Sequence, residues 1–137
     1  MVLHIVIGKQ MRIKMQQRGF TLIELLVVMA VIALLLTIAT PRYFSSVDKS
    51  KEAVLRQNLT LTREALDKYY GDTGKYPDSL EALVSKRYLR RLPVDPITES
   101  DNTWIIVPPE DQEKGGVFDI KSGAPGNAEG GISYSEW

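Results

Sequence analysis

The residues that could take part in chemistry lie near the N-terminus, where Gly19 and Phe20 open a long apolar stretch that contains Glu24. Glycine lets a chain lie flat in a protease cleft, so the Gly19–Phe20 bond is a candidate cut site. Cleavage there would give Phe20 a new ammonium group four residues from Glu24. A carboxylate near hydrocarbon costs several kcal/mol and usually marks a function. Pairing with that ammonium, in the same chain or in a neighbouring subunit, would offset the cost.

The element that positions these residues is an apolar segment over 20–39. At about 1.5 Å per residue, a helix of this length spans roughly 30 Å, which is enough to cross the hydrocarbon of a bilayer. Apolar residues occupy every face, so packing of one side onto a soluble core cannot account for them. The surroundings must be lipid or other copies of the same helix. The polar residues in the segment are Thr21, Glu24 and Thr37.

A basic leader, residues 1–19, precedes the apolar segment. It has four cations and no acidic residue, which predicts a cytoplasmic N-terminus and an exported remainder. Met11 is an alternative start that would leave a compact basic leader. The whole chain balances 17 basic against 17 acidic residues, and loss of the leader cations would leave 13 against 17, a net charge of −4. Such a mildly acidic remainder gives no reason to expect nucleic-acid binding. The leader cations are Lys9, Arg12, Lys14 and Arg18.

Two rival interpretations of this region stay open. An ordinary secretory signal peptide would have residues 22–36 as its apolar core and residues 37–39 as its cleavage site, although Glu24 would be an odd intrusion there. A plain uncleaved anchor would show the same apolar run. The first residue of the exported protein separates the three cases, because a signal peptidase would leave Thr40 at the N-terminus.

A family resemblance begins at Arg18. The order Arg-Gly-Phe-Thr-Leu-Ile-Glu over 18–24, followed by an apolar helix, resembles the class III signal of type IV pilins and type II secretion pseudopilins. The resemblance implies that a prepilin peptidase cuts between Gly19 and Phe20 and N-methylates Phe20, and that Glu24 acts in assembly.

Pro41 ends the apolar run and lacks a backbone N–H, so we expect it to kink or loosen the helix. In the family, a proline here marks where the helix bends or melts in the filament.

The remainder, 42–137, predicts a small exported head. Apolar residues recur on about one third of a helix circumference over 42–70, which predicts an amphipathic helix that continues the hydrophobic helix of 20–41. A short helix is expected at about 79–86, with Asp78 as its N-cap. Aromatic and β-branched runs predict an antiparallel β-region over about 103–137, with a third strand near 132–134. The apolar positions of the amphipathic helix are Phe44, Val47, Val54, Leu55, Leu59, Ala65, Leu66 and Tyr69.

The predicted fold class is therefore α+β and type IV pilin-like. A long N-terminal helix, hydrophobic in its first half and amphipathic in its second, packs on a small antiparallel β-sheet. The predicted domains are a leader over 1–19, a transmembrane or filament-core helix over 20–41, and a periplasmic head over 42–137.

Composition argues against an enzyme. The sequence has no cysteine, and its one histidine, His4, lies in the leader. The processed chain would therefore lack Cys–His pairs, histidine-assisted serine triads and ordinary zinc sites. It also lacks a phosphate-binding glycine loop. Within the resembling family, the lack of cysteine favours a pseudopilin, because many type IV pilins close a disulfide.

A second resemblance, to the major pseudopilin of type II secretion, covers Lys-Tyr-Pro at 75–77, Leu-Glu-Ala-Leu at 80–83 and Tyr-Leu-Arg-Arg-Leu-Pro-Val-Asp-Pro at 88–96. In that family the loop after the strand at 118–123 typically binds calcium. Calcium takes about six to eight oxygen ligands, several of them carboxylates, and this loop is poor in acids. Asp119, Asn127 and Glu129, together with backbone carbonyls, could make a weak calcium site. No other cofactor is predicted.

The sequence thus predicts a structural filament subunit, the major pseudopilin of a type II secretion system. The resemblance implies a helical homopolymer that drives protein export from the periplasm. Its implied partners are the prepilin peptidase, the minor pseudopilins, an inner-membrane assembly platform and, before assembly, membrane lipid. The alternative is a type IV pilin for adhesion, motility or DNA uptake. A rival of another class is a membrane-tethered binding domain that never polymerises.

Overall fold

The computed structural model describes Gly8 and residues 16–137. Most of the predicted leader, including His4, Met11 and three of its four cations, lies outside the described residues. The chain forms two compact units, Met1–Ala39 and Thr40–Trp137. The first unit contributes the beginning of helix α1, and the second contains the rest of α1 together with every other regular element that the structure describes.

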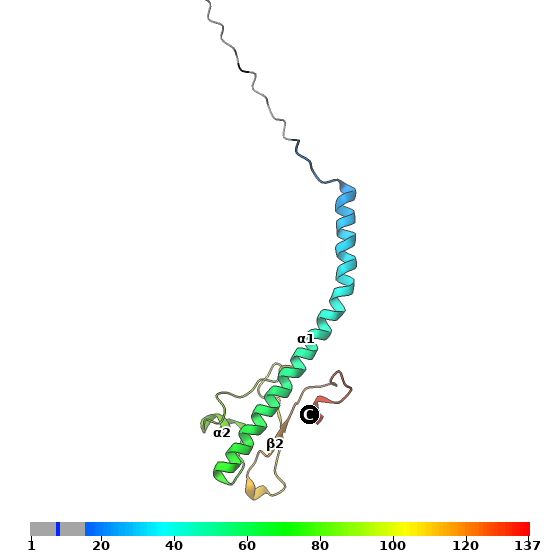
Figure 1. Ribbon diagram of the computed structural model, residues 1–137. Helices are drawn as coiled ribbons and strands as arrows, with labels where there is room; N and C mark the ends of the chain where they lie inside the picture. The colour runs from blue at the N-terminus through cyan, green and yellow to red at the C-terminus, as the bar shows by residue number, and fades with distance from the viewer. Residues whose placement is uncertain (1–7, 9–15) are drawn as a thin grey trace, which may run out of the picture. The chain divides into compact units, whose positions relative to one another are not determined.

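The described elements confirm the predicted α+β class. Helix α1 spans Leu22–Thr73 and α2 spans Leu80–Ser85 (Figure 1). The sheet has two antiparallel strands, β1 (Ile105–Val107) and β2 (Asp119–Lys121), with Ile106 opposite Ile120. Two short 3₁₀ helices complete the order, η1 at Gln112–Lys114 and η2 at Tyr134–Glu136.

Helix α1 ends three residues later than the stop predicted near Tyr70. Gly71 stays helical, and the helix ends at Thr73, where Gly74 takes φ +74 and donates its N–H to the Tyr70 carbonyl at 2.8 Å. This is the left-handed glycine cap that closes many helices, because glycine has no Cβ to oppose a positive φ.

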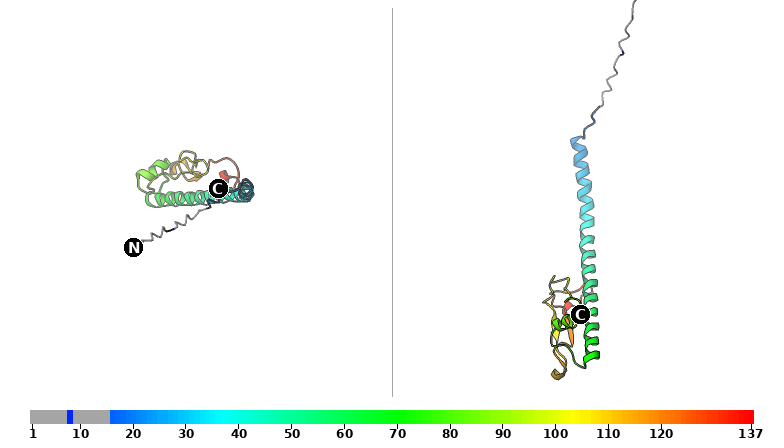
Figure 2. Two further views of the ribbon diagram at one scale, coloured as in Figure 1. Left: turned by 90° about the horizontal axis from the view of Figure 1, so that it is seen from above. Right: turned by 90° about the vertical axis from the view of Figure 1, so that its left-hand side faces the viewer.

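In the second unit, α2 and the sheet lie along one side of α1 (Figure 2). Side chains of α1 fasten this arrangement to distant parts of the chain. Asn58 donates its amide to the Val94 carbonyl at 2.8 Å, which ties the extended connection before β1 to the helix. Arg63 pairs with Asp119 on β2 at 2.8 Å. Polar side chains of α1, in addition to its apolar stripe, therefore attach the rest of the head to the helix.

The core lies between α1, α2 and the sheet. Trp104 is 7% exposed and donates its indole N–H to the Pro93 carbonyl at 2.8 Å, so its one polar atom is satisfied. Thr62 is also fully buried, and its hydroxyl is satisfied because it donates to the Asn58 carbonyl within α1. The buried apolar residues are Leu55, Leu59, Ala65, Leu66, Leu80, Leu83, Trp104, Val117, Ile120, Ala124, Ala128 and Tyr134.

Two positions assigned to the apolar stripe of α1 were predicted wrongly. Phe44 is 60% exposed and Val54 is 48% exposed. The buried part of α1 begins only at Leu55. Helical periodicity places residues on one face of the helix, but it does not reveal where along the helix the head begins.

The predicted cap of α2 was also wrong. Its N-cap is Ser79, and no side chain caps it. The Pro77 carbonyl accepts backbone N–H groups from Gly116 and Val117 at 3.2 and 2.9 Å. These bonds anchor the chain just before the helix, which begins at Leu80 and leaves Asp78 outside the cap position.

The third strand expected near 132–134 is absent from the described residues. Ala128 and Ile132 are joined by a backbone bond of 2.8 Å around a turn in which Gly131 has φ +81. Only a single bridge, Asn127 to Ser133, pairs these residues as in a sheet. The turn occupies the residues that a strand would need, and η2 follows at once.

Candidate functional site

The Gly19–Phe20 bond lies in a stretch without regular structure, residues 16–21, immediately before α1. The Phe20 side chain is 88% exposed. A Cβ built on Gly19 would meet no atom of the described residues within 4 Å, so nothing in that part of the chain requires a glycine there. A protease needs an accessible segment outside regular structure, and residues 16–21 are exposed and irregular. Any demand for glycine at this position must therefore come from a partner.

Glu24 sits in the first turn of α1, where its backbone N–H donates to Thr21 Oγ1 at 3.1 Å. Thr21 is thus the N-cap residue, and Glu24 occupies the third helical position after it. This is the spacing of a capping box, and the positive end of the helix dipole favours an acid there. The capping role of Thr21 was not predicted from the sequence, although the Thr-x-x-Glu spacing over 21–24 is the signal that could have revealed it.

The capped helix gives Glu24 a defined place but no counter-charge. Among the residues that the structure describes, its carboxylate makes no ion pair. The positive helix end offsets only part of the cost of a charge beside hydrocarbon, typically about 0.3–1 kcal/mol at an exposed site. A cation supplied from elsewhere would therefore be stabilising.

The apolar part of α1 is fully uncovered in the isolated chain. α1 carries a stretch long and apolar enough to cross a bilayer, and none of that stretch is buried within the chain. This exposure extends all round the helix: Leu22, Ile23, Leu25, Leu26, Val27, Val28, Met29, Val31, Ile32, Leu34, Leu35, Leu36 and Ile38 are each at least 46% exposed. A continuous apolar surface of this kind marks contact with a membrane or with other proteins.

Pro41 lies inside α1 and does not end it. Proline cannot donate a hydrogen bond to the carbonyl of residue 37, four positions earlier, so the backbone ladder has a gap at this point. The neighbouring Thr37 hydroxyl donates to the Ala33 carbonyl at 2.8 Å within the helix. The loosening expected at Pro41 in a filament stays a prediction.

The three calcium candidates lie at two separate places. Asp119 Oδ1 accepts from Arg63 Nε at 2.8 Å and from the Ile120 N–H at 2.7 Å. Asn127 and Glu129 line a different hollow, beside Glu52 of α1. Arg63 and Glu52 are eleven residues apart in one helix, which is about 16 Å along its axis. Asp119 therefore does not join the other two around one ion, whose ligand distances are about 2.3–2.6 Å.

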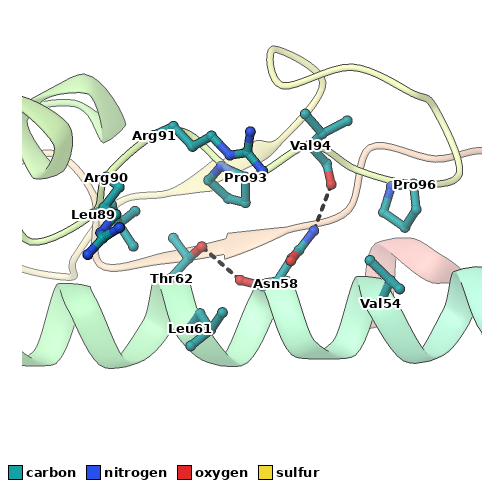
Figure 3. A pocket seen from close by; sticks show the side chains of 10 residues that line it. All are labelled: Val54, Asn58, Leu61, Thr62, Leu89, Arg90, Arg91, Pro93, Val94 and Pro96. Carbon is teal, nitrogen blue, oxygen red and sulfur yellow. Dashed lines mark hydrogen bonds between the residues drawn. The ribbon is translucent and has the colours of Figure 1, made fainter.

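A groove of about 460 Å³ runs between α1 and the extended connection before β1. Figure 3 shows Asn58 bridging this groove to the Val94 carbonyl, with Val54 and Leu61 on the helix side. Leu61 and Val94 are 46% and 47% exposed. Asn58 is a polar residue of α1, and its bond to the Val94 carbonyl positions the extended connection against the helix.

A long, uncovered apolar helix continued by a small α+β head, with a processing motif at its start, defines a type IV pilin-like subunit. Residues 14–40 match the family model described as the prokaryotic N-terminal methylation motif. No solved structure matches the chain significantly.

Relatives extend the match over the head. The chain is 34% identical to the type II secretion system core protein G of Pseudomonas aeruginosa over 132 residues, covering 85% of this chain and 89% of that protein. It is 30% identical to the protein of the same name from Escherichia coli, covering 84% and 86%. The Vibrio cholerae protein of that name is 29% identical over 94% of this chain and 95% of its own length.

The chain belongs to the family of type II secretion system core G proteins, the major pseudopilins. This membership confirms the major-pseudopilin prediction over the type IV pilin alternative. The relatives are named as core proteins of a secretion system.

Proposed function

We propose that the chain is made as a precursor, cut between Gly19 and Phe20, methylated on Phe20, and polymerised into a periplasmic pseudopilus that drives protein export. The observation that carries the proposal is local to the helix start. An exposed, irregular Gly19–Phe20 bond directly precedes a capped helix. The first turn of that helix holds a carboxylate that has no ion-pair partner among the described residues.

Before assembly, the apolar half of α1 is proposed to span the inner membrane once, with the basic leader in the cytoplasm and the head in the periplasm. The charge asymmetry across the segment supports this topology. The leader cations would also retain the N-terminus on the cytoplasmic side until the prepilin peptidase removes them.

In the filament, the same apolar surface is proposed to exchange lipid for neighbouring copies of the helix. Leaving lipid for another apolar surface gives little hydrophobic gain, so packing and polar contacts must decide the register. Removal of the leader creates an ammonium on Phe20. A Glu24 carboxylate of a neighbouring subunit would neutralise it in a medium of low dielectric constant, where an unpaired charge is costly.

The proposed partners follow from this cycle. They are further copies of the chain, the prepilin peptidase, the minor pseudopilins and the inner-membrane assembly platform. Family membership supports assembly with components of the secretion system, and the individual partners are part of the proposal.

The test is the mass of the N-terminal peptide of the protein purified from its native membrane. We expect a chain that begins with N-methylated Phe20. An intact leader would show that the chain is a plain anchor, and a chain beginning at Thr40 would show a secretory signal peptide. Either result would overturn the proposal. Chemical crosslinking of the same membranes is expected to give a ladder of oligomers, which a tethered monomer would not.

A further inference from the structure

Residues 126–137, called here the latch segment, fold back onto α1 (Figure 2). The central contact is the Oε1 atom of Glu52. It accepts the backbone N–H of Glu129 at 2.9 Å and the hydroxyl of Tyr134 at 3.0 Å. Both bonds are charge-assisted, so each is stronger than the same bond to a neutral acceptor.

Aromatic contacts extend this attachment. The guanidinium of Arg56, one turn beyond Glu52 on α1, lies 4.4 Å from the centre of the Trp137 ring. Trp137 in turn meets Tyr134 edge to face with ring centres 5.4 Å apart. Tyr134 is 8% exposed and belongs to the hydrophobic core. The segment is thus attached through hydrogen bonds, a cation–π contact and core packing together.

The Lys49–Glu129 pair adds little to this attachment. Its atoms are 3.4 Å apart, and its side chains are 61% and 57% exposed. Exposed pairs of this kind contribute little to stability, because solvent screens them and ordering two long side chains costs entropy. The pair does, however, bring an ammonium group to the hollow that the latch segment forms with α1.

The hollow holds about 350 Å³ and is lined by Ser45, Asp48, Glu52, Asn127, Glu129 and Tyr134. It contains two of the calcium candidates, Asn127 and Glu129, but its residues do not fit a calcium site. Glu52 Oε1 already accepts two hydrogen bonds, and the Glu129 carboxylate faces the Lys49 ammonium. No three acidic, histidine or cysteine side chains of the described residues are grouped to hold a metal. The remaining candidate, Asp119, is held by Arg63 elsewhere.

We propose that the latch segment is fastened to α1 by the side chains of Glu52, Tyr134, Arg56 and Trp137, and that this attachment needs no calcium ion. In this latch, Glu52 acts as a hydrogen-bond acceptor and not as a metal ligand. The proposal concerns the head alone and does not depend on processing or polymerisation.

The acceptor role gives a sharp test. Glutamine at position 52 keeps an Oε1 atom that can accept both bonds but loses the charge that calcium requires. Alanine removes the acceptor altogether. Glu64→Ala is the matched control, because Glu64 is an exposed acid of the same helix without a bond to the latch segment. Tyr134→Phe is a milder variant that removes one of the two bonds and keeps the ring.

The measurement is amide hydrogen exchange of residues 126–137 in the full-length chain in detergent micelles, with about 5 mM calcium chloride or with excess chelator. We expect the protection of wild type to be equal in the two conditions. Glu52→Ala should lose about tenfold or more of that protection, since two charge-assisted bonds are lost. Glu52→Gln should lose clearly less than Glu52→Ala, Tyr134→Phe should lie between wild type and Glu52→Ala, and Glu64→Ala should match wild type.

Three results would overturn the proposal. One is protection that rises with calcium or falls with chelator, because an ion would then hold the segment. Another is a loss in Glu52→Gln as large as in Glu52→Ala, because charge and not hydrogen bonding would then decide. The third is unchanged protection in both Glu52→Ala and Tyr134→Phe. If Glu52→Ala fails to fold, the comparison of Glu52→Gln, Tyr134→Phe and wild type in the two calcium conditions still decides the question.

Discussion

Arg63 on α1 donates its Nε proton to Asp119 Oδ1 on β2 at 2.8 Å, and its Nη2 group donates to the neighbouring Ile120 carbonyl at 3.0 Å. One guanidinium therefore binds both a side chain and the backbone of the same strand. The two side chains are 38% and 29% exposed, so solvent screens part of their attraction. This contact joins the helix to the sheet across 56 residues of sequence.

Breaking this contact should destabilise the head measurably. We expect Arg63→Ala and Asp119→Ala each to lower the free energy of unfolding by about 1–2 kcal/mol, the range for hydrogen bonds to charged groups reduced for exposure. The double variant should reveal a coupling energy of about 0.5–1 kcal/mol. Denaturant unfolding of the full-length chain in detergent measures all four terms of the cycle. A coupling of zero would contradict the proposed link between helix and sheet.

Gly19→Val should block processing and leave the fold unchanged. No atom of the described residues lies within 4 Å of a Cβ at Gly19, so the substitution meets no obstacle in the described part of the chain. A branched side chain beside the cut bond would hinder its entry into the peptidase cleft. Immunoblots should show only the precursor, while the thermal unfolding of the head stays as in wild type. Normal processing of this variant would mean that the peptidase does not select a small residue here.

Glu24→Ala should insert in the membrane but assemble poorly. Without the carboxylate, the Phe20 ammonium of the proposed filament would be buried unpaired, and breaking one partner of a buried pair costs about 3–5 kcal/mol. We expect the yield of crosslinked filament to fall about a hundredfold or more. Thr37→Ala is the control, because it removes another polar group from the same apolar segment without removing charge. Normal filaments in Glu24→Ala would refute the pairing.

The Tyr134 hydroxyl should make the stability of the head depend on pH in the alkaline range. Burial raises the pKa of Tyr134, and its hydrogen bond to Glu52 and the charges of Glu52, Asp48 and Asp95 raise it further. The proton is held more tightly in the folded state. Its stabilising effect is therefore complete below the unfolded pKa of about 10 and is lost as the pH rises through the higher folded pKa.

The comparison of wild type with Tyr134→Phe isolates this effect. We expect the free energy of unfolding of wild type to fall more steeply than that of Tyr134→Phe as the pH rises above about 10. Tyr88, whose pKa is raised chiefly by its hydrogen bond to Asp72, contributes equally to both proteins. Parallel pH profiles would show that the Tyr134 hydroxyl is not titrated differently in the folded chain.

Features encoded locally could be predicted from the sequence. The apolar run, the Gly19–Phe20–Glu24 spacing and the α+β class each depend on neighbouring residues or on a repeating pattern. Contacts between distant segments could not be predicted. Glu52 reads as an ordinary charge on a helix, and only the return of residues 129 and 134 makes it an acceptor. Asp119 was a candidate for a weak calcium site, and its ion pair with Arg63 could not be predicted because the two residues lie far apart in sequence.

The Thr21 cap lies on the retained side of the proposed cut. Trimming after Gly19 would leave Phe20 as the first residue. It would keep both the Thr21 hydroxyl and the Glu24 N–H that donates a hydrogen bond to it. We therefore expect helix α1 to start at the same turn in the precursor and in the trimmed chain. Removal of the leader would then alter the charge at the N-terminal end of α1 without refolding the helix. The enzyme that trims the chain would need neither to wait for a conformational change nor to cause one.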